Sequence, residues 1–156
     1  MKNNKKDISI IIRTLNEEKY LDQLLKAIKK QILNMSYEII IVDSGSTDNT
    51  ITIAASHKCI IRYIYKDDFT FGRSLNLGCQ YANGKYLVII SGHCIPVDNY
   101  WIKSLLEPLE NDIVSYVYGR QIAGKTSYIS ESNIFKKYFP EKDKLPQQGY
   151  FCNNAN

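Results

Sequence analysis

Residues 38–48 read EIIIVDSGSTD, a continuous apolar run that breaks off into a short polar segment. A run of this length predicts a strand that is buried on both faces, as in a parallel sheet. Gly45 permits a tight turn, and Ser46 or Thr47 can cap a following helix. A carboxylate such as Asp43 can accept an N–H from a nucleobase edge. A plain strand-to-helix turn with capping residues explains the same segment equally well.

Strands and amphipathic helices alternate on both sides of this stretch. The predicted strands are residues 8–12, 38–42, 60–65, 86–90 and 113–118. Four helices are predicted between or after these strands. Asn16 caps the first, whose apolar positions run from Leu21 to Ile32, and the second follows Asp48. The third lies within residues 69–82 and ends at Asn83 and Gly84, and the fourth begins at Asp98 and is shortened by Pro108. This alternation predicts an α/β fold with a doubly wound, mostly parallel sheet.

Polar residues collect where the predicted strands end. They are Arg13 and Thr14, Asp43 and Ser44, Asp67 and Asp68, and Ser91-Gly92-His93. Ligands of open α/β sheets bind beside the carboxyl ends of the strands. The clustering therefore indicates a ligand site at that edge, and it carries more weight than any single motif.

Two histidines need separate interpretations. His93 follows a buried strand at the ligand edge, where a neutral imidazole could bind a divalent metal. A histidine hydrogen-bonded within its loop is the simpler interpretation, because one histidine alone makes no metal site. His57 lies at a predicted helix end, where it is expected to interact with the helix dipole.

Length and composition favour a single domain over residues 1–156, with a core at about 8–120 and a less regular part at 121–156. The net charge of +4 suits anionic small ligands or weak attraction to an acidic membrane surface, without indicating nucleic acid. The four cysteines (59, 79, 94 and 152) form no Cys-X-X-Cys pair, which argues against a zinc ribbon and favours a reducing, cytoplasmic compartment. Neither a signal peptide nor an apolar stretch of about 20 residues is recognised.

Residues 119–126, GRQIAGKT, match the P-loop pattern G-x-x-x-x-G-K-[ST] and follow a predicted strand. The 30 residues after Thr126 are too few for the further strands and the magnesium-binding Asp of a P-loop domain. A P-loop nucleotidase that uses Gly119–Thr126 is therefore kept only as the least favoured alternative.

Several ordered segments together resemble family 2 glycosyltransferases. They are ISIIIRTLNE at 8–17, IIVDSGSTD at 40–48, FTFGRSLN at 69–76 and GKY at 84–86, with a weaker trace at 151–156. Members of this family are inverting enzymes of the GT-A fold, which transfer a sugar from a nucleotide-diphosphate donor to an acceptor hydroxyl. The resemblance covers roughly residues 8–120 and implies a hexosyltransferase-type enzyme of polysaccharide or cell-surface glycan synthesis.

The resemblance implies a role for each matching position. The expected nucleotide-binding residues are Thr14, Asn16, Glu17, Asp43, Ser44, Arg73, Ser91 and Gly92, with Asp43 at the base, most often uracil. The Asp-X-Asp motif of the family is replaced here by Ser91-Gly92-His93. The resemblance therefore gives His93 the place of the residue that holds Mn²⁺ or Mg²⁺ at the diphosphate. Because an imidazole replaces a carboxylate, weaker binding, an altered metal preference and no metal binding all stay open.

The catalytic base of the family is an Asp or Glu in a later motif, and Glu141 and Asp143 lie too early to match it. The chain is therefore expected to be a C-terminally truncated, donor-binding part that is inactive in transfer alone. Its expected partners are a UDP-sugar and a glycan or lipid-linked acceptor, and its expected place is the cytoplasm, with peripheral association at the inner face of the membrane. A non-catalytic binding module or pseudoenzyme is the alternative.

Overall fold

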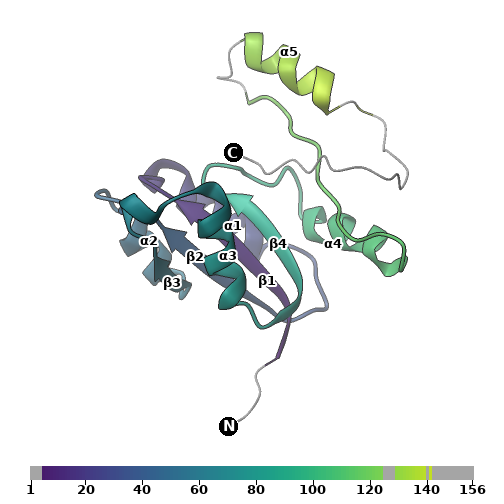
Figure 1. Ribbon diagram of the computed structural model, residues 1–156. Coiled ribbons are helices and arrows are strands. Elements are labelled where there is room, and N and C mark those ends of the chain that lie inside the picture. Colours follow the sequence, from purple (N-terminus) through teal and green to yellow (C-terminus); the bar gives the residue numbers. More distant parts are fainter. Residues whose placement is uncertain (1–4, 125–128, 140, 142–156) are drawn as a thin grey trace. The chain divides into compact units, whose positions relative to one another are not determined.

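The computed structural model describes residues 5–124, 129–139 and 141, and a parallel sheet forms the centre of its first unit (Figure 1). Its strands are β1 (Lys6–Thr14), β2 (Tyr37–Asp43), β3 (Ile60–Tyr63) and β4 (Gly84–Ser91). They lie in the order β3-β2-β1-β4, and every pair is parallel. The prediction of a mostly parallel α/β sheet is therefore confirmed. Contacts divide the chain after Ser104 into two units, and each is described by itself.

Isoleucines of the two central strands make up the core. Ile10, Ile11 and Ile12 of β1 and Ile40 and Ile41 of β2 are fully buried. A strand with neighbours on both sides and helices over both faces has no solvent-facing side, so its sequence does not alternate. This is why continuous apolar runs identified the strands.

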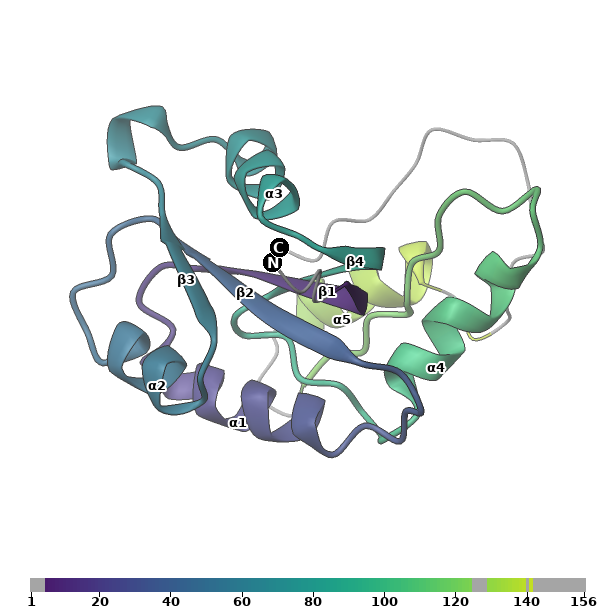
Figure 2. The ribbon, with the colours of Figure 1, turned by 90° about the horizontal axis from the view of Figure 1, so that it is seen from below.

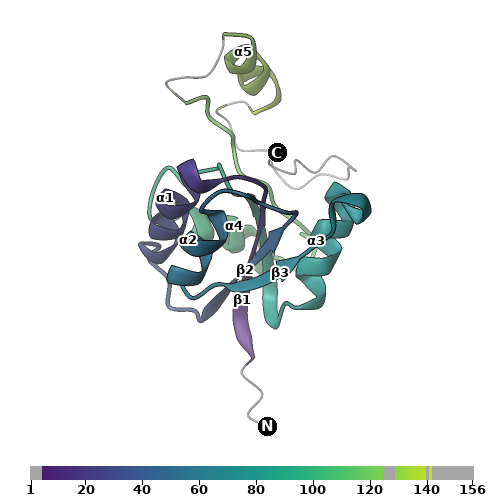
Figure 3. The ribbon, with the colours of Figure 1, turned by 90° about the vertical axis from the view of Figure 1, so that its left-hand side faces the viewer.

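Helices cover the two faces of the sheet. Helices α1 (Glu18–Lys29) and α2 (Thr50–Ser56) lie on one face, whereas α3 (Phe71–Gln80) lies on the other (Figures 2 and 3). The buried residues of α1 recur at helical spacing: Leu21, Leu24, Leu25 and Ile28. The sheet is thus doubly wound, as predicted. Helix α1 ends at Lys29, so Ile32 lies beyond it and is exposed.

Short helical segments complete the described chain. They are the 3₁₀ turn η1 (Lys66–Asp68), helix α4 (Trp101–Leu106), the 3₁₀ turn η2 (Glu107–Glu110) and helix α5 (Ile129–Tyr138). The expected shortening of the fourth helix at Pro108 is confirmed, because the α-helix ends at Leu106. The strand predicted at 113–118 is wrong: residues 113–124 contain neither strand nor helix. Helix α5 was not predicted.

The second unit contains α5. The rings of Phe135 and Phe139, one helical turn apart, meet edge to face with centroids 6.3 Å apart. Arg120 Nη2 lies 3.2 Å from Glu141 Oε1. Of the P-loop pattern, residues 119–124 are described, and Lys125 and Thr126 lie outside the described residues.

The described cysteines, Cys59, Cys79 and Cys94, are all free thiols, and Cys152 lies outside the described residues. Burial raises the pKa of Cys59 to about 11, so its thiol stays protonated at neutral pH. Among the helices of the described part, none has the length and hydropathy that crossing a bilayer requires.

Gly84 opens β4 rather than ending a helix, since α3 already stops at Gln80. Its N–H donates to Ser9 Oγ over 2.9 Å, and the buried Ser9 hydroxyl donates to Glu38 Oε1 over 2.7 Å. A Cβ at Gly84 would collide with the backbone of Ile8 and Ser9. The glycine therefore allows the start of β4 to approach β1.

We expect Gly84→Ala to lower the free energy of unfolding by about 1–3 kcal/mol, because backbone atoms must move to admit the methyl group. Gly72→Ala is the matched control, since a Cβ there meets nothing within 4 Å and alanine favours the helix. Urea unfolding of the two variants checks this. A Gly84→Ala protein as stable as Gly72→Ala would contradict the described packing of β4 on β1.

Candidate functional site

The strand order reverses at β1. The chain passes from β1 outward through β2 to β3, then returns to the other side of β1 to form β4. In the sheet register, Thr14 pairs with Asp43 and Arg13 pairs with Ser91. The residues predicted at the ends of the first, second and fourth strands therefore meet at one edge, beside the reversal where ligands bind in such sheets. Asp67 and Asp68 lie in the 3₁₀ turn η1, beyond the end of β3.

Asp43 is the most heavily hydrogen-bonded residue of this edge and is only 1% exposed. Its Oδ1 accepts the N–H groups of Gly45 and Ser46 over 2.9 and 2.8 Å. Its Oδ2 accepts the hydroxyls of Thr14, over 2.7 Å, and of Ser46. Together these four donors occupy the acceptor sites of a carboxylate. A nucleobase can therefore donate a hydrogen bond to Asp43 only where the Thr14 or Ser46 hydroxyl rotates away.

Asn16 links the loop after β1 to the loop after β2. Its backbone is left-handed, with φ +55°, a region that asparagine tolerates. Its N–H donates to Ser46 Oγ over 2.9 Å, and its Oδ1 accepts the N–H of Thr47 over 2.8 Å. The prediction that Asn16 caps α1 is wrong, because Glu17 occupies the cap position. The left-handed Gly45, with φ +103°, confirms the tight turn expected there.

The N-termini of α1 and α2 are joined by acidic side chains. Asp48 accepts the N–H groups of Glu18 and Thr50 over 3.0 and 2.9 Å, and Glu18 Oε2 accepts the N–H of Asn49 over 3.0 Å. Burial opposes ionisation of Asp48, but its hydrogen bonds outweigh burial and keep the pKa below the usual value. The cap position of α2 is Asn49, so the predicted caps, Ser46 and Thr47, are wrong.

His93 lies against Glu17. His93 Nδ1 and Glu17 Oε1 are 2.8 Å apart, and their side chains are 42% and 15% exposed. A Cβ at Gly92 would come within 2.8 Å of Glu17 Cγ, so Gly92 leaves the space that Glu17 fills. The structure thus joins three predicted site residues into one imidazole–carboxylate pair and its supporting glycine.

Arg13 also lies at this edge. It was noted as a polar residue at a strand end, but it was not among the expected nucleotide-binding residues. It is 8% exposed, with Nη2 3.4 Å from Ser91 Oγ and the guanidinium 4.7 Å from the Phe71 ring centroid. Burial lowers its pKa, yet an arginine stays protonated at neutral pH. A buried cation therefore lies beneath the ligand edge. A charged residue at the end of an apolar strand was the signal for it.

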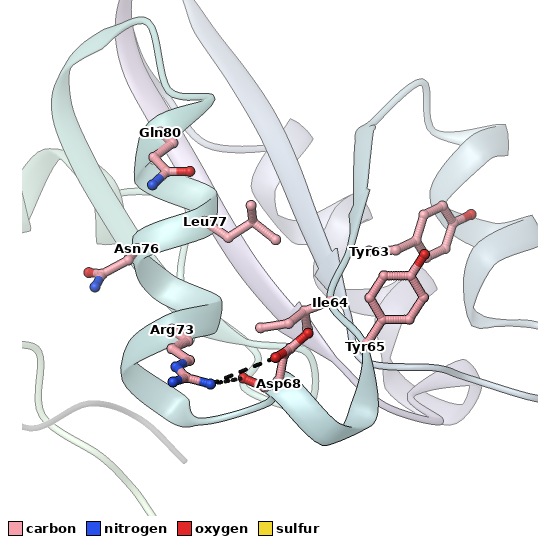
Figure 4. Close-up of a pocket in the computed structure, with 8 residues that line it drawn as sticks. All are labelled: Tyr63, Ile64, Tyr65, Asp68, Arg73, Asn76, Leu77 and Gln80. Atoms are coloured by element: carbon pink, nitrogen blue, oxygen red, sulfur yellow. Dashed lines mark hydrogen bonds and ion pairs between the residues drawn. The ribbon is translucent and has the colours of Figure 1, made fainter.

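Arg73 lies in the first turn of α3, where it contacts Asp68. Its Nη1 is 3.4 Å from the carbonyl oxygen of Asp68 and 3.9 Å from Asp68 Oδ1 (Figure 4). It lines a hollow of about 390 Å³ with Tyr63, Ile64, Tyr65, Asp68, Asn76, Leu77 and Gln80. The N–H of Ile64 donates to the Asp43 carbonyl over 2.9 Å. The hollow therefore adjoins the Asp43 loop, although Arg73 itself bonds to Asp68.

His57 lies away from this edge. Its Nε2 is 2.9 Å from Asp22 Oδ1, which links the end of α2 to α1. The hydrogen bonds from Lys26 and His57 hold the pKa of Asp22 below its usual value. His57 thus contributes to packing between two helices, and it provides a control for experiments on His93.

Comparison with families of known proteins gives a match over nearly the whole chain. The family described as Glycosyl transferase family 2 matches residues 9–154. Chondroitin synthase of Pasteurella multocida (strain Pm70) is 30% identical in an alignment of 138 residues that covers 85% of this chain and 14% of that protein. This chain therefore spans a small part of that relative.

Solved structures resemble the fold. Staphylococcus aureus TarS 1–349 superposes with a TM-score of 0.59 at 22% identity, covering 67% of this chain and 32% of that structure. Glucosyl-3-phosphoglycerate synthase of Mycobacterium tuberculosis, crystallised with Mn²⁺, UDP and glucosyl-3-phosphoglycerate, gives a TM-score of 0.55 at 23% identity, covering 68% and 40%. At these identities the likeness shows the fold.

Proposed function

Because this chain belongs to glycosyl transferase family 2 and has the GT-A fold, we propose that it binds a UDP-sugar at the carboxyl edge of its sheet. There it would serve inverting transfer of the sugar to an acceptor hydroxyl. The observation that carries the proposal is that Thr14 pairs with Asp43, and the adjacent Arg13 with Ser91, where the strand order reverses. The solved complexes of TarS with UDP-GlcNAc and of the mycobacterial synthase with UDP support the choice of donor.

The charges of the edge suit a nucleotide diphosphate. The base would lie at Asp43, where the Thr14 or Ser46 hydroxyl gives way to it. The hollow that Arg73 lines adjoins this loop and offers a cation to the nucleotide. Asn16 and Ser44 shape the loops around the base, and the buried Arg13 attracts the diphosphate.

We propose that Mn²⁺ or Mg²⁺ binds with the diphosphate beside His93. Within residues 5–124, 129–139 and 141, no group of three or more His, Cys, Asp or Glu side chains could hold a metal by itself. Such ions are often held by one or two protein groups together with substrate phosphates and water. The His93 imidazole, with Glu17 on its Nδ1, fits the role of a single protein ligand to such an ion. When bound, the ion neutralises charge on the diphosphate leaving group.

We further propose that this chain does not transfer sugar by itself. A general base must reach the acceptor hydroxyl, and the described carboxylates near the edge already serve other contacts. Asp43 and Asp48 hold the loops, and Glu17 contacts His93. Chromatography of UDP released from UDP-GlcNAc, with and without sugar acceptors, tests this. Steady turnover by the chain would refute it.

Glycan or lipid-linked acceptors, and a role in polysaccharide synthesis, are part of the same proposal. The relative named chondroitin synthase supports the acceptor class. A cytoplasmic location with peripheral membrane association is compatible with the net charge of +4 and the free thiols of the described cysteines. Sedimentation with vesicles containing anionic lipid tests the association, and no binding at low salt would refute it.

Base selectivity tests the donor assignment. UDP and UDP-GlcNAc are expected to raise the melting temperature more than GDP or ADP, because a ligand that binds only the folded state stabilises it. Equal shifts with all three diphosphates would contradict uracil recognition at Asp43.

Lys125→Ala separates this proposal from a P-loop nucleotidase. A P-loop follows a strand, whereas described residues 113–124 form none. We expect the variant to bind UDP as tightly as the parent protein in a calorimetric titration. Loss of ATP binding in Lys125→Ala, with UDP binding absent from both proteins, would instead support the P-loop interpretation.

A further inference from the structure

The pair formed by Glu17 and His93 has more structure than two adjacent side chains at a rim. Glu17 follows β1 and His93 follows β4, 76 positions later, yet Nδ1 and Oε1 are 2.8 Å apart. The carboxylate is largely buried, whereas the imidazole is partly exposed. One partner is thus fixed within the protein, and the other faces solvent at the ligand edge.

The backbone of Glu17 is fixed on both sides. Its N–H donates to Thr50 Oγ1 over 2.8 Å, and its carbonyl accepts the N–H of Leu21 over 2.9 Å. The side chain packs where a Cβ on Gly92 would lie. The backbone of Glu17 is therefore held in place, and its carboxylate faces His93.

A carboxylate at one ring nitrogen selects the imidazole tautomer. As an acceptor, ionised Glu17 favours a proton on Nδ1 of the neutral ring, which leaves the lone pair on Nε2. Histidines that bind metals commonly donate their other N–H to a carboxylate in this way, which fixes the ring and strengthens the ligand.

We propose that Glu17 is a positioning residue that holds His93 with Nε2 ready for a divalent cation at the donor diphosphate. The inference rests on the proposed function. It gives Glu17 a different role from the nucleotide contact that the family resemblance implies. Glu17 would act through His93, without touching the nucleotide.

The neighbouring Glu18 offers a matched control. Its Oε2 accepts from the backbone N–H and the side-chain amide of Asn49, over 3.0 and 2.9 Å, and it contacts the loop before α2 instead of His93. Replacing either Glu17 or Glu18 with alanine removes one negative charge from the start of α1. Only the Glu17 change removes the partner of the imidazole.

The experiment measures ring-nitrogen chemical shifts of His93 in ¹⁵N-labelled protein and Mn²⁺ affinity in the presence of UDP. We expect the parent protein to carry the proton on Nδ1. Glu17→Ala should lose that preference and bind Mn²⁺ about 10- to 100-fold more weakly. Glu18→Ala should match the parent in both measurements, and Glu17→Gln, which keeps an acceptor oxygen, should recover much of the tautomer preference.

Each other outcome has a definite meaning. An unchanged tautomer and unchanged Mn²⁺ affinity in folded Glu17→Ala would overturn the inference. Tight binding of UDP that does not respond to Mn²⁺ would also overturn it while leaving the donor site intact. If the parent protein binds no UDP, the proposed function fails, and this inference fails with it. The tautomer measurement would then still show whether Glu17 orients His93.

Discussion

Asp43→Ala is expected to weaken UDP binding by at least about tenfold and to lower the free energy of unfolding by about 2–4 kcal/mol. The carboxylate receives four donors, from Gly45, Ser46 and Thr14, and is only 1% exposed. Alanine leaves these donors without their acceptor, so the loop loses its shape as well as its charge. Urea unfolding and calorimetric titration with UDP measure the two effects.

A second variant separates loop structure from base recognition. His57→Ala removes a part-buried contact with Asp22 of α1, away from the ligand edge, so it should cost stability but little UDP affinity. Equal losses of UDP affinity in Asp43→Ala and His57→Ala would indicate a general loss of folding. That result would remove Asp43 from the proposed base site.

His93→Ala is expected to abolish the part of UDP binding that depends on metal. In Mn²⁺ the affinity should fall about 10- to 100-fold, whereas in EDTA the variant and the parent protein should bind UDP alike. The reason is that His93 is the metal ligand of the proposed site, with Glu17 on its other ring nitrogen. Titrations with and without Mn²⁺ provide the measurement.

His57→Ala again serves as the control, since it also removes one imidazole. It should retain the full response to Mn²⁺. If His93→Ala keeps the same response as the parent protein, the metal binds elsewhere or not at all. The replacement of the family's Asp-X-Asp by Ser91-Gly92-His93 would then mark a site without a protein metal ligand.

Prediction from sequence succeeded where local pattern and structure coincide. The apolar runs at β1 and β2 are buried on both faces, so every residue carries the same signal. The parallel arrangement then places Thr14 beside Asp43 without any knowledge of their side chains. For this reason the meeting of these strand-end residues at one edge of the sheet could be predicted from the strand ends alone.

Features that depend on distant partners could not be predicted. Asn16 looks like a helix cap, but its partner Thr47 lies 31 positions away and fixes a left-handed turn. The apolar positions at 113–118 resemble a strand, yet Ile113 is largely exposed and this segment pairs with none of the described strands. A strand requires a neighbour to satisfy its backbone, and local sequence does not supply one.

In the site too, single residues could be predicted from the sequence, whereas contacts between distant residues could not. Family resemblance selected Glu17, Gly92 and His93 one by one, but no spacing rule joins positions 17 and 93. Arg13 was noted only as a polar strand end, and its burial beneath Ser91 required the sheet register. Arg73 was expected at the nucleotide, and that role stays a prediction because its described partner is Asp68.

Calorimetric titration of UDP-GlcNAc into the folded chain, first in Mn²⁺ and then in EDTA, tests the central claim most directly. The account predicts a single saturable site whose affinity decreases when the metal is removed. UDP should compete for that site. No measurable binding of UDP or UDP-GlcNAc in either buffer, with the protein shown to be folded, would contradict the donor site at the carboxyl edge of the sheet.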